Sequence, residues 1–113
     1  KLELSYLQTM SSGDPQTMKV LLESLLKELN DDLPKARKLY QRKDWKGLER
    51  FCHHFKSTLS FSGDTTLIKA NLALWDIAKA APTTDKKGAQ LISQMERSGL
   101  NVSREVKRIL ASI

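Results

Sequence analysis

The chain has 113 residues, of which 40% are hydrophobic and 28% are charged, and its formal net charge is +6. This length suits one domain, spanning residues 1–113, with a single hydrophobic core, and it is too short to enclose a deep substrate cavity as well. No apolar run reaches the roughly 20 residues of a membrane-spanning helix, and the basic residues are scattered with few aromatic residues among them, which argues against direct membrane contact and nucleic-acid binding.

Helical spacing of apolar residues recurs along the chain, whereas the alternation typical of strands is nearly absent. A short first helix or turn, which stops at residues 11–13, carries Leu4, Tyr6 and Leu7. Asp14 suits the N-cap of a second helix and Pro15 its first position, where the missing N–H costs nothing. The apolar face of this second helix consists of Met18, Leu21, Leu22, Leu25 and Leu29.

Polar residues and prolines mark the boundaries of the later helices. The segment 30–34 either interrupts the second helix or caps a successor, whose apolar face would be Leu33, Ala36, Leu39 and Tyr40. Asp44 can cap a helix that begins at Trp45 and ends or loosens at Gly63. Its apolar residues are Leu48, Phe51, Cys52, Phe55 and Leu59.

Two further helices are expected in the last part of the chain. Asp64 can cap the first of them, which ends before Pro82. Its apolar positions are Leu67, Ile68, Leu72, Trp75 and Ile77. Asp85 opens the last helix, and Gly99 leaves open whether that helix is split.

The expected fold is therefore all-α, an up-and-down four-helix bundle with an additional short N-terminal helix, because short connections favour antiparallel neighbours. In this bundle the helix from Trp45 packs between the second helix and the helix that Asp64 caps. The expected contacts join Phe51, Phe55 and Leu59 to Leu21, Leu22 and Leu25 on one side and to Leu67 and Leu72 on the other.

The helix from Trp45 carries an adjacent pair of histidines with different expected environments. An advance of about 100° per residue puts His53 about 150° from the centre of the apolar face, so its side chain should meet water. His54 points about 100° away from His53, toward the flank of the helix. The residues that share the exposed arc with His53 are Glu49, Lys56, Ser57 and Ser60.

The exposed residues around His53 can be interpreted without phosphoryl transfer. An exposed histidine on an amphipathic helix is most often a polar residue on a solvated face. Adjacent histidines point in different directions and do not share a metal ion easily, while Glu49 with His53 would make only a two-ligand site. Hydrolytic motifs are absent, and Cys52 is directed toward the core.

The run from Cys52 to Gly63 resembles the signature of histidine-containing phosphotransfer (HPt) domains. That signature has a phosphorylated histidine, a lysine three residues on, a small residue next, and a glycine ten residues after the histidine; these positions hold His53, Lys56, Ser57 and Gly63. The segments 4–7, 13–15 and 43–45 and the leucine-rich second helix also look like this family, so the resemblance covers nearly the whole chain.

Two positions depart from the common pattern of the family. Ser57 stands where glycine is usual after the lysine, and Cys52 stands where alanine is often found before the histidine. Both replacements are small, so a partner can still approach closely. The spacing to Lys56 and Gly63 assigns the phosphoacceptor role to His53 rather than to His54.

The resemblance implies a phosphorelay intermediate of two-component signalling. His53 would accept a phosphoryl group from an aspartate of a response-regulator receiver domain and pass it to another receiver aspartate, with Lys56 stabilising the phosphoryl charge. It also implies a phosphotransfer protein with no kinase or ATPase activity and no cofactor of its own, the Mg²⁺ belonging to the receiver. The expected docking residues are Lys46, Arg50, Ser57, Ser60 and Gly63.

Other features bear on the setting of the chain. The single cysteine suits a reducing compartment and hence the cytoplasm. Because the chain begins at Lys1, we expect it to be part of a longer polypeptide, and the C-terminal domain of a membrane-bound hybrid sensor kinase is one candidate. We expect a monomer. The alternative to a phosphorelay role is a helical docking module that is not phosphorylated.

Overall fold

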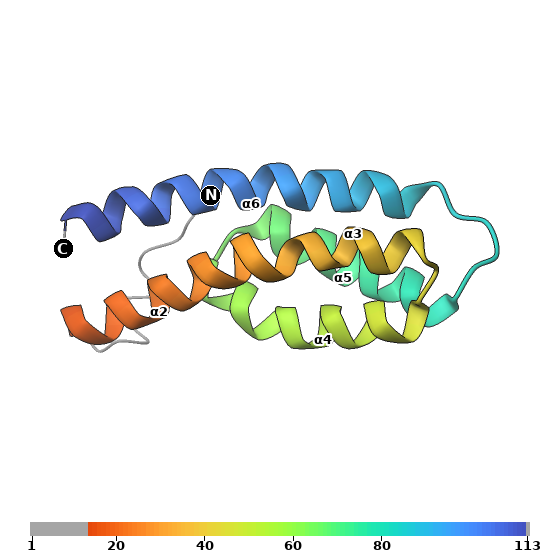
Figure 1. The fold of residues 1–113 in the computed structure, drawn as a ribbon, viewed down its shortest axis with the longest axis horizontal. Helices are drawn as coiled ribbons and strands as arrows, with labels where there is room; N and C mark the ends of the chain where they lie inside the picture. The colour runs from red at the N-terminus through yellow and green to blue at the C-terminus, as the bar shows by residue number, and fades with distance from the viewer. Residues whose placement is uncertain (1–13, 113) are drawn as a thin grey trace.

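The computed structural model describes residues 14–112, apart from the side chain of Phe61, and this part of the chain is helical without any strand (Figure 1). The elements are α2 (Pro15–Lys27), the π-helical turn η1 (Glu28–Asp32), α3 (Leu33–Gln41), α4 (Trp45–Ser62), α5 (Thr65–Ala80) and α6 (Lys87–Ser112). The expected short N-terminal helix lies outside the described residues. Among the described helices, none combines the length and the apolar composition needed to cross a bilayer.

The aspartates that precede the helices act as caps, as predicted. The side chains of Asp14, Asp44 and Asp64 each accept a hydrogen bond from a backbone N–H in the first turn of α2, α4 and α5. Asp85 does the same at the start of α6, and Pro15 occupies the first turn of α2. Each bond satisfies a donor that the helix itself leaves unpaired, so helix starts are determined locally.

The segment 30–34 does not break the chain, and α2 continues through η1 into α3 as one long rod (Figure 1). The backbone N–H of Leu33 bonds to the carbonyl of Glu28, five residues earlier, which is the π-helical pattern. Pro34 has no N–H, and its ring would crowd the carbonyl of Asn30 in a regular α-helix. A wider turn accommodates the proline without ending the rod.

The core lies where α4, α5 and α6 meet the α2–α3 rod, and it confirms most of the predicted contacts. Fully buried members are Leu22, Leu25, Phe55, Leu59 and Leu67. Leu21 and Phe51 are only partly buried. Leu72 is 43% exposed and lies at the edge of the core, where it lines a small pocket together with Leu59. The buried stripe of α5 follows Leu67, Asn71, Leu74 and Ala78, and Leu72 is rotated about 100° away from Asn71.

Gly99 does not split the last helix, since α6 runs unbroken from Lys87 to Ser112. The residue is buried, and a Cβ atom there would lie 2.8 Å from Cδ2 of Leu33. Gly99 therefore lets the rod approach α6 closely. Its role is one of packing rather than of helix termination.

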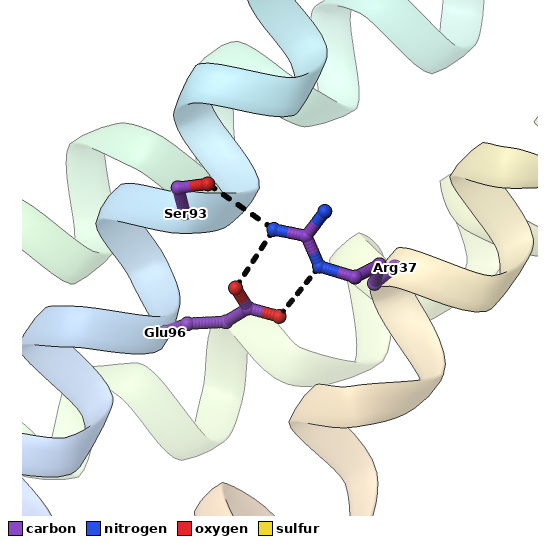
Figure 2. A network of polar contacts seen from close by, with 3 residues as sticks. All are labelled: Arg37, Ser93 and Glu96. Carbon is purple, nitrogen blue, oxygen red and sulfur yellow. Dashed lines mark hydrogen bonds and ion pairs between the residues drawn. The ribbon is translucent and has the colours of Figure 1, made fainter.

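A polar network on the surface also joins the rod to α6 (Figure 2). The guanidinium of Arg37 donates to both carboxylate oxygens of Glu96, at 2.9 Å from Nε and 2.8 Å from Nη2, and Nη2 also donates to Ser93 at 3.1 Å. The hydrogen bond from Arg37 lowers the pKa of Glu96. This two-pronged geometry fixes the position of α3 along α6.

Candidate functional site

The exposed face of α4 presents the histidine pair as predicted. Cys52 and Phe55 are buried in the core, while His53 and His54 are exposed. Because the apolar face of α4 packs against α2, α3 and α5, His53 lies on the side of the helix that these neighbours leave open, and His54 lies at its flank toward η1. The rotation of α4 thus places the candidate phosphoacceptor on the surface.

His53 contacts α5 through Trp75. The ring centroids are 5.2 Å apart and the ring planes meet at 75°, which is an edge-to-face arrangement. One turn away, Nδ2 of Asn71 donates to the backbone carbonyl of Cys52 at 2.9 Å, and this bond fixes α5 against α4 next to the histidine. From the sequence, Trp75 was expected to be a core residue, and no local pattern indicates its contact with His53.

His54 lies on the opposite flank of α4. Its Nε2 is 3.5 Å from Oε1 of Glu28 in η1, and its side chain is 79% exposed. The other oxygen of Glu28 accepts a hydrogen bond from the hydroxyl of Thr58. The two histidines therefore have different partners, an indole on α5 for His53 and a carboxylate on η1 for His54.

Lys56 and Ser57 follow His53 within about one turn, and both are exposed. Lys56 also borders a small pocket of about 60 Å³, whose other lining residues are Leu59, Ser60, Ile68, Asn71 and Leu72. The hydroxyl of Ser60 donates to the backbone carbonyl of Lys56 at 3.0 Å. Since a hydroxyl has one proton, Ser57 is the better candidate donor to a bound anion.

The remaining predicted site residues lie farther along α4. Lys46 and Arg50 are exposed in the turns before His53. Gly63 caps the C-terminus of α4 with a φ of 64°, in the left-handed region that favours glycine. Ten residues of helix correspond to about 15 Å, so Gly63 is not adjacent to His53. The structure brings together His53 and Lys56, but not Gly63.

The residues near His53 offer little prospect of thiol catalysis or of metal binding. Burial raises the pKa of the Cys52 thiol to about 12, so the nucleophilic thiolate is scarce at neutral pH. Within residues 14–112 there is no cluster of three or more histidine, cysteine, aspartate or glutamate side chains that could hold a metal ion. The accessible nucleophiles in this region are the imidazole nitrogens of the two exposed histidines, His53 and His54.

A scan against protein-family models and searches of curated proteins and of solved structures found no match to this chain. The functional proposal below is therefore based on the residues of α4 and α5, on their geometry, and on the resemblance of the segment 52–63 to the HPt signature.

Proposed function

We propose that this chain is a phosphotransfer module of the HPt type, which receives a phosphoryl group on His53 from a receiver-domain aspartate and passes it to another. The observation that carries the proposal is the shared exposure of His53 and Lys56 on one open face of α4, in the register of the HPt signature. Such a face lets a receiver domain approach and supplies a cation beside the phosphoryl group.

The proposed step is a direct exchange between two side chains. The unprotonated ring nitrogen of His53 forms a bond to phosphorus while the bond from phosphorus to the aspartyl oxygen breaks. The aspartate leaves as a carboxylate, and the proton on the other ring nitrogen stays in place. Transfer to the next receiver is the reverse exchange with a new carboxylate, so no nucleotide or external oxidant takes part.

Charge explains how a partner would find this face. Receiver domains of this class present an acidic pocket that holds Mg²⁺, and Lys46, Arg50 and Lys56 are exposed cations on α4. Complementary charge raises the rate of encounter more than the final affinity. In this proposal Ser57 is the small residue that lets the receiver domain approach α4 closely. Ser60 supports the helix backbone. Gly63 ends α4 beyond the surface that the receiver would contact.

For an HPt-type domain we also expect a particular helix arrangement, cellular location and oligomeric state. The helices would form an up-and-down four-helix bundle, with a short N-terminal helix before Asp14. The chain would act in the cytoplasm as a monomer, either alone or as the C-terminal part of a hybrid sensor kinase tethered to the membrane. It would bind no metal itself and would have no kinase or ATPase activity.

The test is incubation with a receiver domain that carries a radiolabelled aspartyl phosphate. The chain should gain phosphate that is labile in acid and stable in alkali, as a phosphoramidate is. His53→Gln should abolish this labelling, whereas His54→Gln should retain most of it, because His54 faces η1 and not the open face that His53 shares with Lys56.

The two histidine variants also give the outcomes that would contradict the proposal. Circular dichroism must first show that both variants keep the helical content of the parent chain. Labelling that survives in His53→Gln and vanishes in His54→Gln would move the acceptor to His54. No labelling of the unmodified chain would leave it as a docking module that is not phosphorylated.

A further inference from the structure

Trp75 contacts both His53 and a lysine that the HPt-like segment does not include. The ammonium of Lys79 lies 4.5 Å from the centroid of the Trp75 ring, and the His53 ring lies 5.2 Å from the same centroid. Helical side chains lean toward the N-terminus of their helix, so Lys79 extends back over the turn that holds Trp75. These two distances place the ammonium of Lys79 within about 10 Å of the His53 ring.

Trp75 and Lys79 differ in the contacts that hold their side chains. The ring of Trp75 is partly buried and packs against the hydrophobic core, and its edge-to-face contact with His53 holds it between α4 and α5. Lys79 is exposed, and no carboxylate of the described residues lies within ion-pair distance of it. The lysine can leave the indole without breaking a salt bridge.

On this basis we propose that Lys79 is a second phosphoryl-binding residue, held on Trp75 until His53 is phosphorylated. The inference depends on the proposed phosphotransfer function and adds a residue from α5 to it. With Lys56 on α4 and Lys79 on α5, cations would flank the phosphoryl group from two helices, and Trp75, which contacts both His53 and Lys79, becomes part of the site.

Lys79 could contact either the indole of Trp75 or the phosphoryl group on His53, and the relative strengths of these two contacts decide which it prefers. A cation over a partly exposed aromatic ring is held only weakly. A phosphoryl group brings close to two negative charges and three strong acceptor oxygens, and hydrogen bonds to charged groups are stronger than the contact of a cation with a ring. Lys79 should therefore exchange the indole for the phosphoryl group, because its flexible four-carbon stem allows the movement.

Proton NMR tests the first half of this inference in the unmodified chain. A methylene group over an indole face is shifted upfield by the ring current, so the ε-protons of Lys79 should resonate upfield of those of Lys69, an exposed lysine on the same helix. Trp75→Leu should remove the shift. After His53 is labelled with phosphoramidate, a small chemical phosphodonor, the ε-protons should return toward the ordinary lysine position.

The binding of the phosphoryl group by Lys79 is tested by the equilibrium distribution of phosphate between His53 and the aspartate of a receiver domain. Lys79→Gln should move the phosphoryl group toward the receiver by about threefold to tenfold, the effect of one charge-assisted hydrogen bond at a partly screened site. Lys79→Arg should keep most of the parent equilibrium, and Lys69→Gln should match the parent.

The outcomes separate this inference from the proposed function. If the unmodified chain is labelled at His53, but Lys79→Gln behaves like Lys69→Gln and the ε-protons do not move on labelling, the function stands and the role of Lys79 is wrong. If His53 takes up no phosphate from either phosphoramidate or the receiver, both proposals fail together.

Discussion

At the scale of single residues, position on α4 decides what each polar side chain can do. His53 and His54 are adjacent in sequence, yet one contacts Trp75 on α5 and the other lies beside Glu28 on η1. The angle of about 100° between successive residues of a helix accounts for this difference. Chemically identical groups thus face different partners.

Lys56 offers the simplest test of a residue that serves the phosphoryl group and not the fold. Its side chain is exposed, so Lys56→Ala should change the free energy of unfolding by no more than about 0.5 kcal/mol. Transfer to His53 should slow by about tenfold or more, because a cation beside the transferring group is lost. Urea unfolding and the initial rate of labelling from a phosphorylated receiver measure the two quantities.

Lys19→Ala is a suitable control, since Lys19 is exposed on α2 and distant in sequence from the histidines. It should leave both stability and transfer unchanged. A large loss of stability in Lys56→Ala, together with a normal rate per folded molecule, would show that Lys56 is a structural residue.

At the scale of elements, one close contact joins the end of α3 to the start of α6. The hydroxyl of Tyr40 donates to the carboxylate of Asp85 at 2.8 Å, and the ring meets Trp45 edge-on at 5.9 Å. Gly88 is buried beneath this ring, where a Cβ atom would come within 2.3 Å of Cε1 of Tyr40. The tyrosine is held on two sides and has little freedom to move away.

We therefore expect Gly88→Ala to destabilise the chain by about 1–3 kcal/mol, the usual cost of overpacking, even though alanine favours a helix. Urea unfolding gives the value. In a Tyr40→Leu background the same substitution should cost less, because the ring atoms that it meets are absent, although Oδ2 of Asp85, 2.5 Å from the added Cβ, remains. An equal or larger cost in that background would place the strain elsewhere than at Tyr40.

At the scale of the whole molecule, the described residues form an elongated body with extents of 47, 21 and 19 Å. The 26 residues of α6 correspond to roughly 39 Å of helix, and α6 contacts α2, η1, α3 and α5. This helix therefore links both ends of the α2–α3 rod to α5, as α4 also does. The Arg37–Glu96 pair is one of its polar links (Figure 2).

Stability should depend on pH through Glu96. The hydrogen bond from Arg37 lowers the pKa of Glu96 from its ordinary value of 4.5. A lowered carboxyl pKa means that the stabilisation is present above that ordinary value and is lost as the pH falls through the lowered one. Because both side chains are more than one third exposed, the contribution should stay below about 1 kcal/mol.

The measurement is urea unfolding near neutral pH and in acid, for the parent chain and for Glu96→Gln. The variant should be slightly less stable near neutral pH, and the difference should shrink in acid, where the parent carboxylate takes up a proton. Glu49→Gln, a change at a glutamate with no ion pair among the described residues, is the control. A difference that grows in acid would contradict this role of Glu96.

Much of the local structure was predictable from the sequence. The aspartates before α2, α4, α5 and α6 are caps, the apolar spacing of α4 predicts the burial of Cys52 and Phe55, and the same period places His53 on the surface. These features depend on backbone donors and on side-chain direction within one helix, and both are properties of neighbouring residues.

Only the tertiary structure decided which side chains meet between helices. The contact of His53 with Trp75, the exposure of Leu72 and the close approach of Leu33 to Gly99 depend on how far each helix is rotated and shifted against its neighbour. Rotation and shift follow from the interlocking of side chains from distant segments, and the period of a single helix carries no information about them.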